Sequence, residues 1–103
     1  MKPIQALFFF VFFLTLTFCA GVPPKEDYVL ALTALENAKN AQADKLEPKL
    51  SYQSKKLYEK ALNFYQERNY TQAKEYFIKA RFVAEKAELR ARIKKYKNGE
   101  VVL

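Results

Sequence analysis

Residues 73–91 carry the pattern that most restricts how this chain can fold. Alanine and phenylalanine recur there at alternating intervals of four and three, at Ala73, Phe77, Ala80, Ala84, Ala87 and Ala91. Because an α-helix turns once in 3.6 residues, this spacing puts all six side chains on one side of a helix. Alanine side chains also let a neighbouring backbone approach closely. The pattern therefore predicts a long helix packed tightly along its alanine side.

The ends of this helix have their own signals. Asn69 is a favourable N-cap, and Gln72 stands three residues later, where it can complete a capping box. The helix is expected to run to Lys97, because Asn98 and Gly99 form a typical stop signal. At about 27 residues, it is the longest element expected.

Two further helices are predicted before it, and no segment shows a strand pattern. The first, about 26–42, follows two prolines and has a stripe at Tyr28, Ala31, Leu35 and Ala38. The second runs from Pro48, a residue suited to the first helical turn, to about Glu67. Its stripe is Leu50, Ser54, Leu57, Ala61 and Phe64. The expected fold is all-α, with a helical domain at 26–97 and a tail at 98–103.

The segment 57–80 resembles a tetratricopeptide repeat, a hairpin of two nested helices about 34 residues long. The matching positions are Leu57, Ala61 and Phe64 in the first helix and Tyr70, Ala73, Phe77 and Ala80 in the second. The preceding helix adds a half-match, so the resemblance covers about one and a half repeats. Lys60, Arg68 and Glu85 depart from the repeat's pattern, and an ordinary three-helix bundle would account for the same spacing.

The N-terminus reads as an export signal. Residues 6–18 form an uncharged run with six phenylalanines, short for a membrane span but typical of a signal peptide, and Cys19, the only cysteine of the chain, follows directly. A lipoprotein signal ends in such a cysteine with Leu three residues before it, as Leu16 is here, although Phe18 is bulkier than the usual small residue. We therefore expect a signal peptide at 1–18, a lipidated Cys19 and a short stiff tether at 19–25. An uncleaved single-pass anchor and cleavage without lipid are the alternatives.

As a whole, the chain resembles small alanine-periodic bacterial lipoproteins with a helical domain of unknown function. That resemblance implies a role in the cell envelope and no catalysis. The expected location is the cell membrane or the outer membrane, lipid-anchored on the periplasmic side. The membrane is thus one partner, and a protein partner or a homo-oligomer is the other.

The composition argues against most catalytic chemistry. The chain has no histidine and no cysteine besides Cys19, so thiolate–imidazole pairs, zinc sites and disulfides within the chain are not expected. The carboxylates appear as ordinary helix-surface charges, for example Asp27, Glu36, Glu59, Glu67, Glu75 and Glu85. Two glycines do not make a phosphate-binding loop. No catalytic, cofactor-binding or metal-binding residue is therefore assigned, and an exported chain does not meet nucleic acid.

A second apolar stripe is predicted on the long helix, opposite the alanines. It consists of Ile78, Phe82, Leu89, Ile93 and Tyr96, within about 60° of one another. We expect it to pack on the first helix, a partner or a second copy, and we expect Leu89, Ile93 and Tyr96 to project beyond the shorter helices. Beside them lies a basic run, Arg90, Arg92, Lys94, Lys95 and Lys97, part of a formal charge of +7.

The function predicted from these features is a non-enzymatic envelope lipoprotein acting as a helical protein-interaction or scaffold module. The alternative is a membrane-anchored protein that uses its basic C-terminal helix to bind anionic lipid or cell-wall polymer.

Overall fold

The computed structural model describes residues 21–99 and is all-helical over that range. Its helices are α2 (Lys25–Asn40), α3 (Ala43–Leu46), α4 (Pro48–Gln66) and α5 (Tyr70–Lys97). Cys19 and the expected signal peptide lie outside the described residues. The all-α prediction is confirmed, with one short helix, α3, that was not expected. The first long helix ends at Asn40, two residues earlier than predicted.

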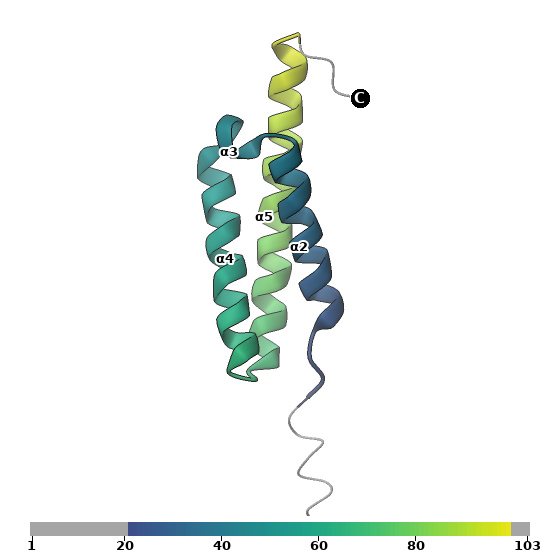
Figure 1. The fold of residues 1–103 in the computed structure, drawn as a ribbon, viewed down its shortest axis with the longest axis vertical. Coiled ribbons are helices and arrows are strands. Elements are labelled where there is room, and N and C mark those ends of the chain that lie inside the picture. Colours follow the sequence, from purple (N-terminus) through teal and green to yellow (C-terminus); the bar gives the residue numbers. More distant parts are fainter. Residues whose placement is uncertain (1–20, 100–103) are drawn as a thin grey trace, which may run out of the picture.

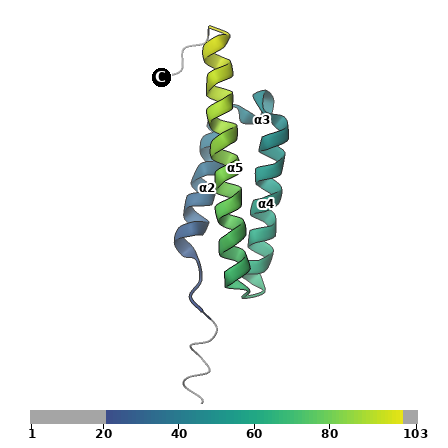
Figure 2. The ribbon, with the colours of Figure 1, turned by 180° about the vertical axis from the view of Figure 1, so that it is seen from behind.

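The long helices pack around α5, with α4 antiparallel to it and α2 parallel to it (Figure 1). Both neighbours lie on the same side of α5, as the view from behind shows (Figure 2), and α2 and α4 contact each other little. The alanine side of the long helix therefore has two neighbours. One alanine stripe serves two helices, because small side chains leave room for both.

The alanine stripe itself is confirmed residue by residue. Its six members are fully buried. On α2 the buried residues are Ala31, Ala34 and Ala38, so Ala34 takes the central place predicted for Leu35, which is half-buried. On α4 the fully buried members of the predicted stripe are Ser54 and Ala61, and the larger ones lie at its edges. Close backbone approach thus dominates the core of this bundle.

The core changes character along the bundle. At one end, which we call the tether end because residues 21–24 enter there, tyrosines surround Phe77, with Tyr28 edge-on at 5.5 Å between ring centroids and Tyr58 at 5.8 Å. At the other end, the C-terminal end, a cluster consists of alanines alone, Ala38, Ala41, Ala43, Ala87 and Ala91, with Leu46 and Leu50 packed against it. Bulky aromatic side chains thus fill the core at the tether end, whereas at the C-terminal end small side chains let the helix backbones come close together.

The turns use two residues in the left-handed region. Gln42 (φ 63°) separates α2 from α3, and Arg68 (φ 61°) separates α4 from α5. Glycine is the usual residue at such positions, because a side chain strains this conformation. After Arg68, the Asn69 side chain accepts a hydrogen bond from the Gln72 amide at 3.4 Å. The predicted N-cap is confirmed, and so is the stop: α5 ends at Lys97, with Gly99 at φ +81°.

Candidate interaction surface on the C-terminal helix

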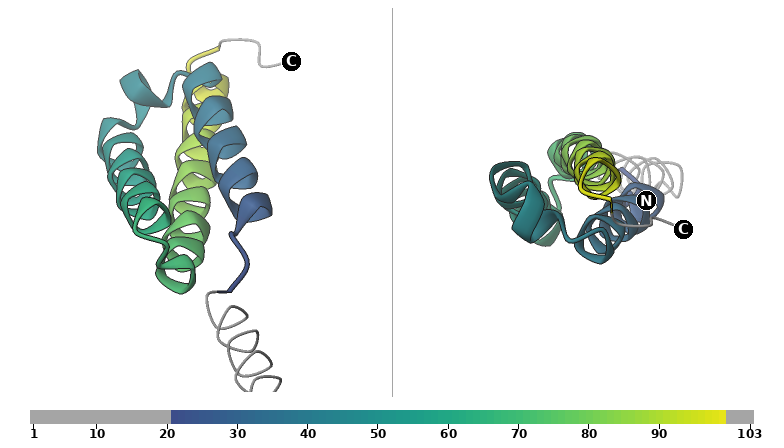
Figure 3. Two further views of the ribbon diagram at one scale, coloured as in Figure 1. Left: turned by 60° about the horizontal axis from the view of Figure 1, so that its bottom comes forward. Right: turned by 90° about the horizontal axis from the view of Figure 1, so that it is seen from above.

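The second stripe of α5, which we call the outer stripe, faces away from the other helices. Phe82 is 72% exposed, Leu89 61% and Tyr96 78%, and Ile78 and Ile93 are nearly half exposed. The reason is geometric: the buried alanines fix the rotation of the helix, and the stripe lies on the opposite side of the same helix. Among the described residues, no helix covers it. Seen from above, α5 lies to one side of both α2 and α4 (Figure 3).

A shallow groove borders the stripe on the α4 side. It has a volume of about 510 Å³ and is lined by Gln53, Leu57, Ile78, Lys79, Phe82 and Val83. Leu57, predicted as a hairpin packing residue, therefore lies beside the outer stripe. The groove widens the apolar surface at Ile78 and Phe82 beyond α5 itself.

The predicted projection of the far end of α5 begins later than expected. Ala91 is fully buried between neighbours from α2 and α3. One turn further on, Lys94 Nζ donates to the Leu46 carbonyl oxygen at 2.7 Å and lies 3.0 Å from a Glu47 carboxylate oxygen. The unexpected helix α3 thus extends the bundle up to Lys94. Leu89 and Ile93 are exposed because they lie on the outward side of α5. Tyr96 lies on the turn of α5 that continues past the contacts of Lys94.

The predicted basic run does not form one patch. Lys94 is held by the start of α4, and Arg92 pairs with Glu88 at 3.1 Å. At 100° per residue, the five cations from Arg90 to Lys97 are distributed around the helix, and only Arg90 and Lys97 lie on one shared flank of the outer stripe. The five cations are close together in the sequence but do not share one side of the helix.

The other residues of the predicted hairpin lie in or beside the core between α4 and α5. Ala61, Ala73 and Phe77 share one buried cluster, and Ala80 is fully buried. Phe64 stacks on Tyr76 at 5.4 Å between ring centroids, and Tyr70 meets Tyr65 edge-on at 5.6 Å. The tyrosine cluster on α4 was missed. Its signal was the seven-residue interval between Tyr58 and Tyr65, which puts both on the side of α4 that contacts Tyr28.

The ionisable groups with shifted pKa values are structural. The Ser51 hydroxyl and the Lys55 ammonium hydrogen-bond the Asp44 carboxylate, and they lower its pKa below the usual 3.8. Burial, with the neighbouring Tyr28 hydroxyl, raises the pKa of Tyr58 to about 12. These contacts join α3 to α4 and α4 to α2 respectively. Within residues 21–99, there is no group of three side chains suited to a metal ion.

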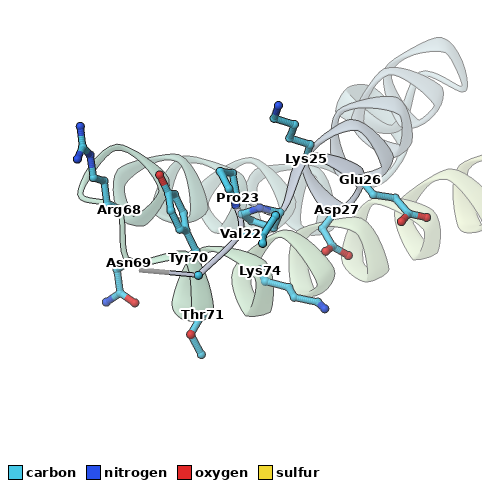
Figure 4. Close-up of a pocket in the computed structure, with 12 residues that line it drawn as sticks. Val22, Pro23, Lys25, Glu26, Asp27, Arg68, Asn69, Tyr70, Thr71 and Lys74 are labelled. Carbon is cyan, nitrogen blue, oxygen red and sulfur yellow. The ribbon is translucent and has the colours of Figure 1, made fainter. Parts of the chain in front are cut away.

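A second hollow, of about 710 Å³, lies where the tether passes the start of α5 (Figure 4). Its wall includes Val22, Asp27, Arg68, Tyr70 and Lys74. Pro24 is buried there, so the chain is held against the bundle as it enters α2. The tether therefore passes beside the α4–α5 turn. This is the end of the bundle opposite the contacts of Lys94 with Leu46 and Glu47.

No described helix is both long enough and apolar enough to cross a bilayer. Comparison with known proteins finds no matching family, and no curated protein or solved structure matches the chain.

Proposed function

We propose that this protein is a non-enzymatic component of the bacterial cell envelope, a helical interaction or scaffold module held at a membrane by lipid on Cys19. The apolar run at 6–18 and the single cysteine directly after it support the location. Its membrane is the cell membrane or the outer membrane, on the periplasmic side. The tether enters at one end of a rigid bundle, so the anchor leaves the sides of the helices accessible.

The observation that carries the functional part is the exposed outer stripe of α5. Large apolar side chains aligned along one helix and open to solvent mark a contact surface rather than a core. They are held by a helix whose opposite side is completely buried, so the surface is rigid. Pre-organised surfaces of this kind lose little conformational freedom on binding.

We further propose that α4 and α5 form a tetratricopeptide-like hairpin, with α2 as the half-repeat before it. The shared cluster of Ala61, Ala73 and Phe77 and the buried Ala80 support this. Stacked repeats of this type leave a face open for another chain. A chain with one and a half repeats has an unpaired face by construction.

The anchor is tested by the intact mass of the mature protein. The expected species begins at Cys19 and carries diacylglycerol on its thiol, and Cys19→Ala should leave an unprocessed precursor. A mature chain that begins at Met1 would replace the lipid with an uncleaved anchor. One that begins at Gly21 without lipid would make the protein secreted.

The surface is tested by replacing Leu89 and Ile93 together with Glu. Crosslinking in intact envelopes should trap a neighbour of the wild type, and the double variant should lose that adduct while keeping its helical circular dichroism. Tyr52→Glu is the matched control, because Tyr52 is 64% exposed on α4 and lies away from the stripe. Adducts unchanged in the double variant would show that the stripe is not the contact surface.

A second candidate function is binding of anionic lipid or cell-wall polymer through the basic C-terminal helix. The observation that favours it is the excess of Lys and Arg over Asp and Glu on the exposed side of α5.

A further inference from the structure

The charges beside the outer stripe of α5 are strongly one-sided. Within about 100° of the stripe's centre, at 100° per residue, α5 carries seven cations, Lys74, Lys79, Arg81, Lys86, Arg90, Arg92 and Lys97, and three acids, Glu75, Glu85 and Glu88. The cations lie on both flanks of the stripe and extend over the whole helix rather than its C-terminal run alone. Apolar residues in the middle and cations on both sides make up an interfacial amphipathic pattern.

Intramolecular pairing leaves most of this charge available. Lys79 pairs with Glu75, Arg81 with Glu85 and Arg92 with Glu88, and surface pairs of this kind contribute little. No carboxylate among the described residues lies within ion-pair distance of Lys74, Lys86, Arg90 or Lys97. An occupant of the stripe therefore meets a positive rim.

We infer that the outer face of α5 lies on an anionic lipid bilayer, with the bundle on its side at the membrane surface. This inference rests on the proposed function, because it names the partner of the same surface. A bilayer of anionic lipid offers both an apolar interior for Phe82 and Leu89 and negative headgroups for the flanking cations. A second copy would bring two sets of seven cations together against six carboxylates, and like charges would repel.

The shape of the molecule fits the same occupant. α5 is the ridge of the bundle, and α2 and α4 lie behind it (Figures 2 and 3). A convex ridge can touch a flat surface along its length, from Ile78 to Tyr96, about 27 Å at 1.5 Å per residue. Tyr96 ends the stripe with a ring suited to the interface between headgroups and acyl chains.

The chain contains no tryptophan, so a single introduced indole reports one position without background. We would place it by Leu89→Trp and by Phe82→Trp on the outer face and by Tyr52→Trp on α4 as the matched control. All three sites are more than half exposed, so the substitutions leave the core intact. The full chain is reconstituted into phosphatidylcholine vesicles with and without phosphatidylglycerol, and brominated acyl chains serve as the quencher.

The expected result is a blue-shifted emission and several-fold stronger quenching at 89 and 82 than at 52, in the anionic vesicles only. Added salt should reduce the quenching by screening the cations. In the Leu89→Trp background, Lys86→Glu with Arg90→Glu should bring quenching close to the control level.

Three results would overturn the inference. Equal quenching at 89 and 52 would mean nonspecific insertion, and equal quenching in neutral and anionic vesicles would remove the role of charge. A blue shift without quenching would assign the stripe to a second copy or another protein. That last result would leave the proposed interaction module intact, whereas a mature chain without lipid on Cys19 would undo its anchor.

Discussion

The two ends of the bundle reach the same helical packing by opposite means. At the tether end, aromatic rings from α2 and α4 enclose Phe77 of α5. At the C-terminal end, alanines bring the backbones together, and polar contacts of Asp44 and Lys94 join the surrounding elements. The first end depends on side-chain volume and the second on the lack of it. Opposite changes in volume should therefore destabilise the two ends: loss of a ring at the tether end and enlargement of an alanine at the C-terminal end.

The largest effect is expected from Phe77→Ala at the tether end. Removing a fully buried ring should cost about 3–5 kcal/mol of unfolding free energy, because the surrounding tyrosines cannot collapse into the space. Denaturant unfolding followed by circular dichroism measures it. Phe82→Ala on the exposed stripe is the control and should change stability by less than about 0.5 kcal/mol. Similar losses for both would mean that Phe77 is not the centre of the core.

At the C-terminal end, stability should instead be lost when an alanine is enlarged. Ala87→Leu should destabilise the fold by about 1–3 kcal/mol, because the added carbons push α2 away from α5. Ala80→Leu, and Ala73→Leu nearer the tether end, should also destabilise the fold, since both alanines are fully buried. Lys74→Leu, on an exposed position, should cost little. If the alanine and lysine variants are equally stable in denaturant, the helices do not pack as closely as described.

A smaller effect is expected where Lys94 joins α5 to the start of α4. Lys94→Met keeps the apolar stem but loses the bond to the Leu46 carbonyl and the pair with Glu47. The expected cost is about 0.5–1 kcal/mol, because the ammonium group is half exposed. Lys97→Met serves as the comparison and should be neutral. Hydrogen exchange at α3 amides would sharpen the result, with faster exchange in Lys94→Met only.

The last effect is a pH dependence at the tether end, which appears only in alkaline solution. The folded pKa of Tyr58, about 12, lies above the usual value of about 10, so the neutral phenol is favoured by folding. The contribution of Tyr58 to stability is complete below pH 10 and is lost as pH rises from about 10 to 12. Tyrosinate absorbance should show a late-ionising component from Tyr58. That late component should disappear in Tyr58→Phe, and its persistence there would assign it to another ring.

Periodicity predicted what depends on one helix alone. The buried alanines of α5, the Asn69 cap and the stop at Asn98 and Gly99 all follow from local spacing and local hydrogen bonds. The outward position of Phe82 and Leu89 follows too, because the alanine stripe fixes the opposite side.

What sequence spacing did not predict depends on pairs of helices. Helix α3 is one turn long, so it is too short to show a helical hydrophobic period in the sequence. Its position decides where the bundle ends and that Lys94 is the cation that contacts Leu46. That two helices share one alanine stripe, and that the cations from Arg90 to Lys97 spread around α5, depends on which neighbours each side meets. The anchoring of Cys19 remains a prediction, because it lies outside the described residues.

The parallel arrangement of α2 and α5 has a consequence for how the chain folds as it is made. Tyr28 meets Phe77, and Ala38 shares a cluster with Ala87, in both cases 49 residues further along the chain. The α4–α5 hairpin instead closes over short distances, such as Tyr65 to Tyr70. Local contacts form first and long loops close late. Helix α2 therefore emerges before α4 and α5 but docks after they have paired, when most of the polypeptide has been made.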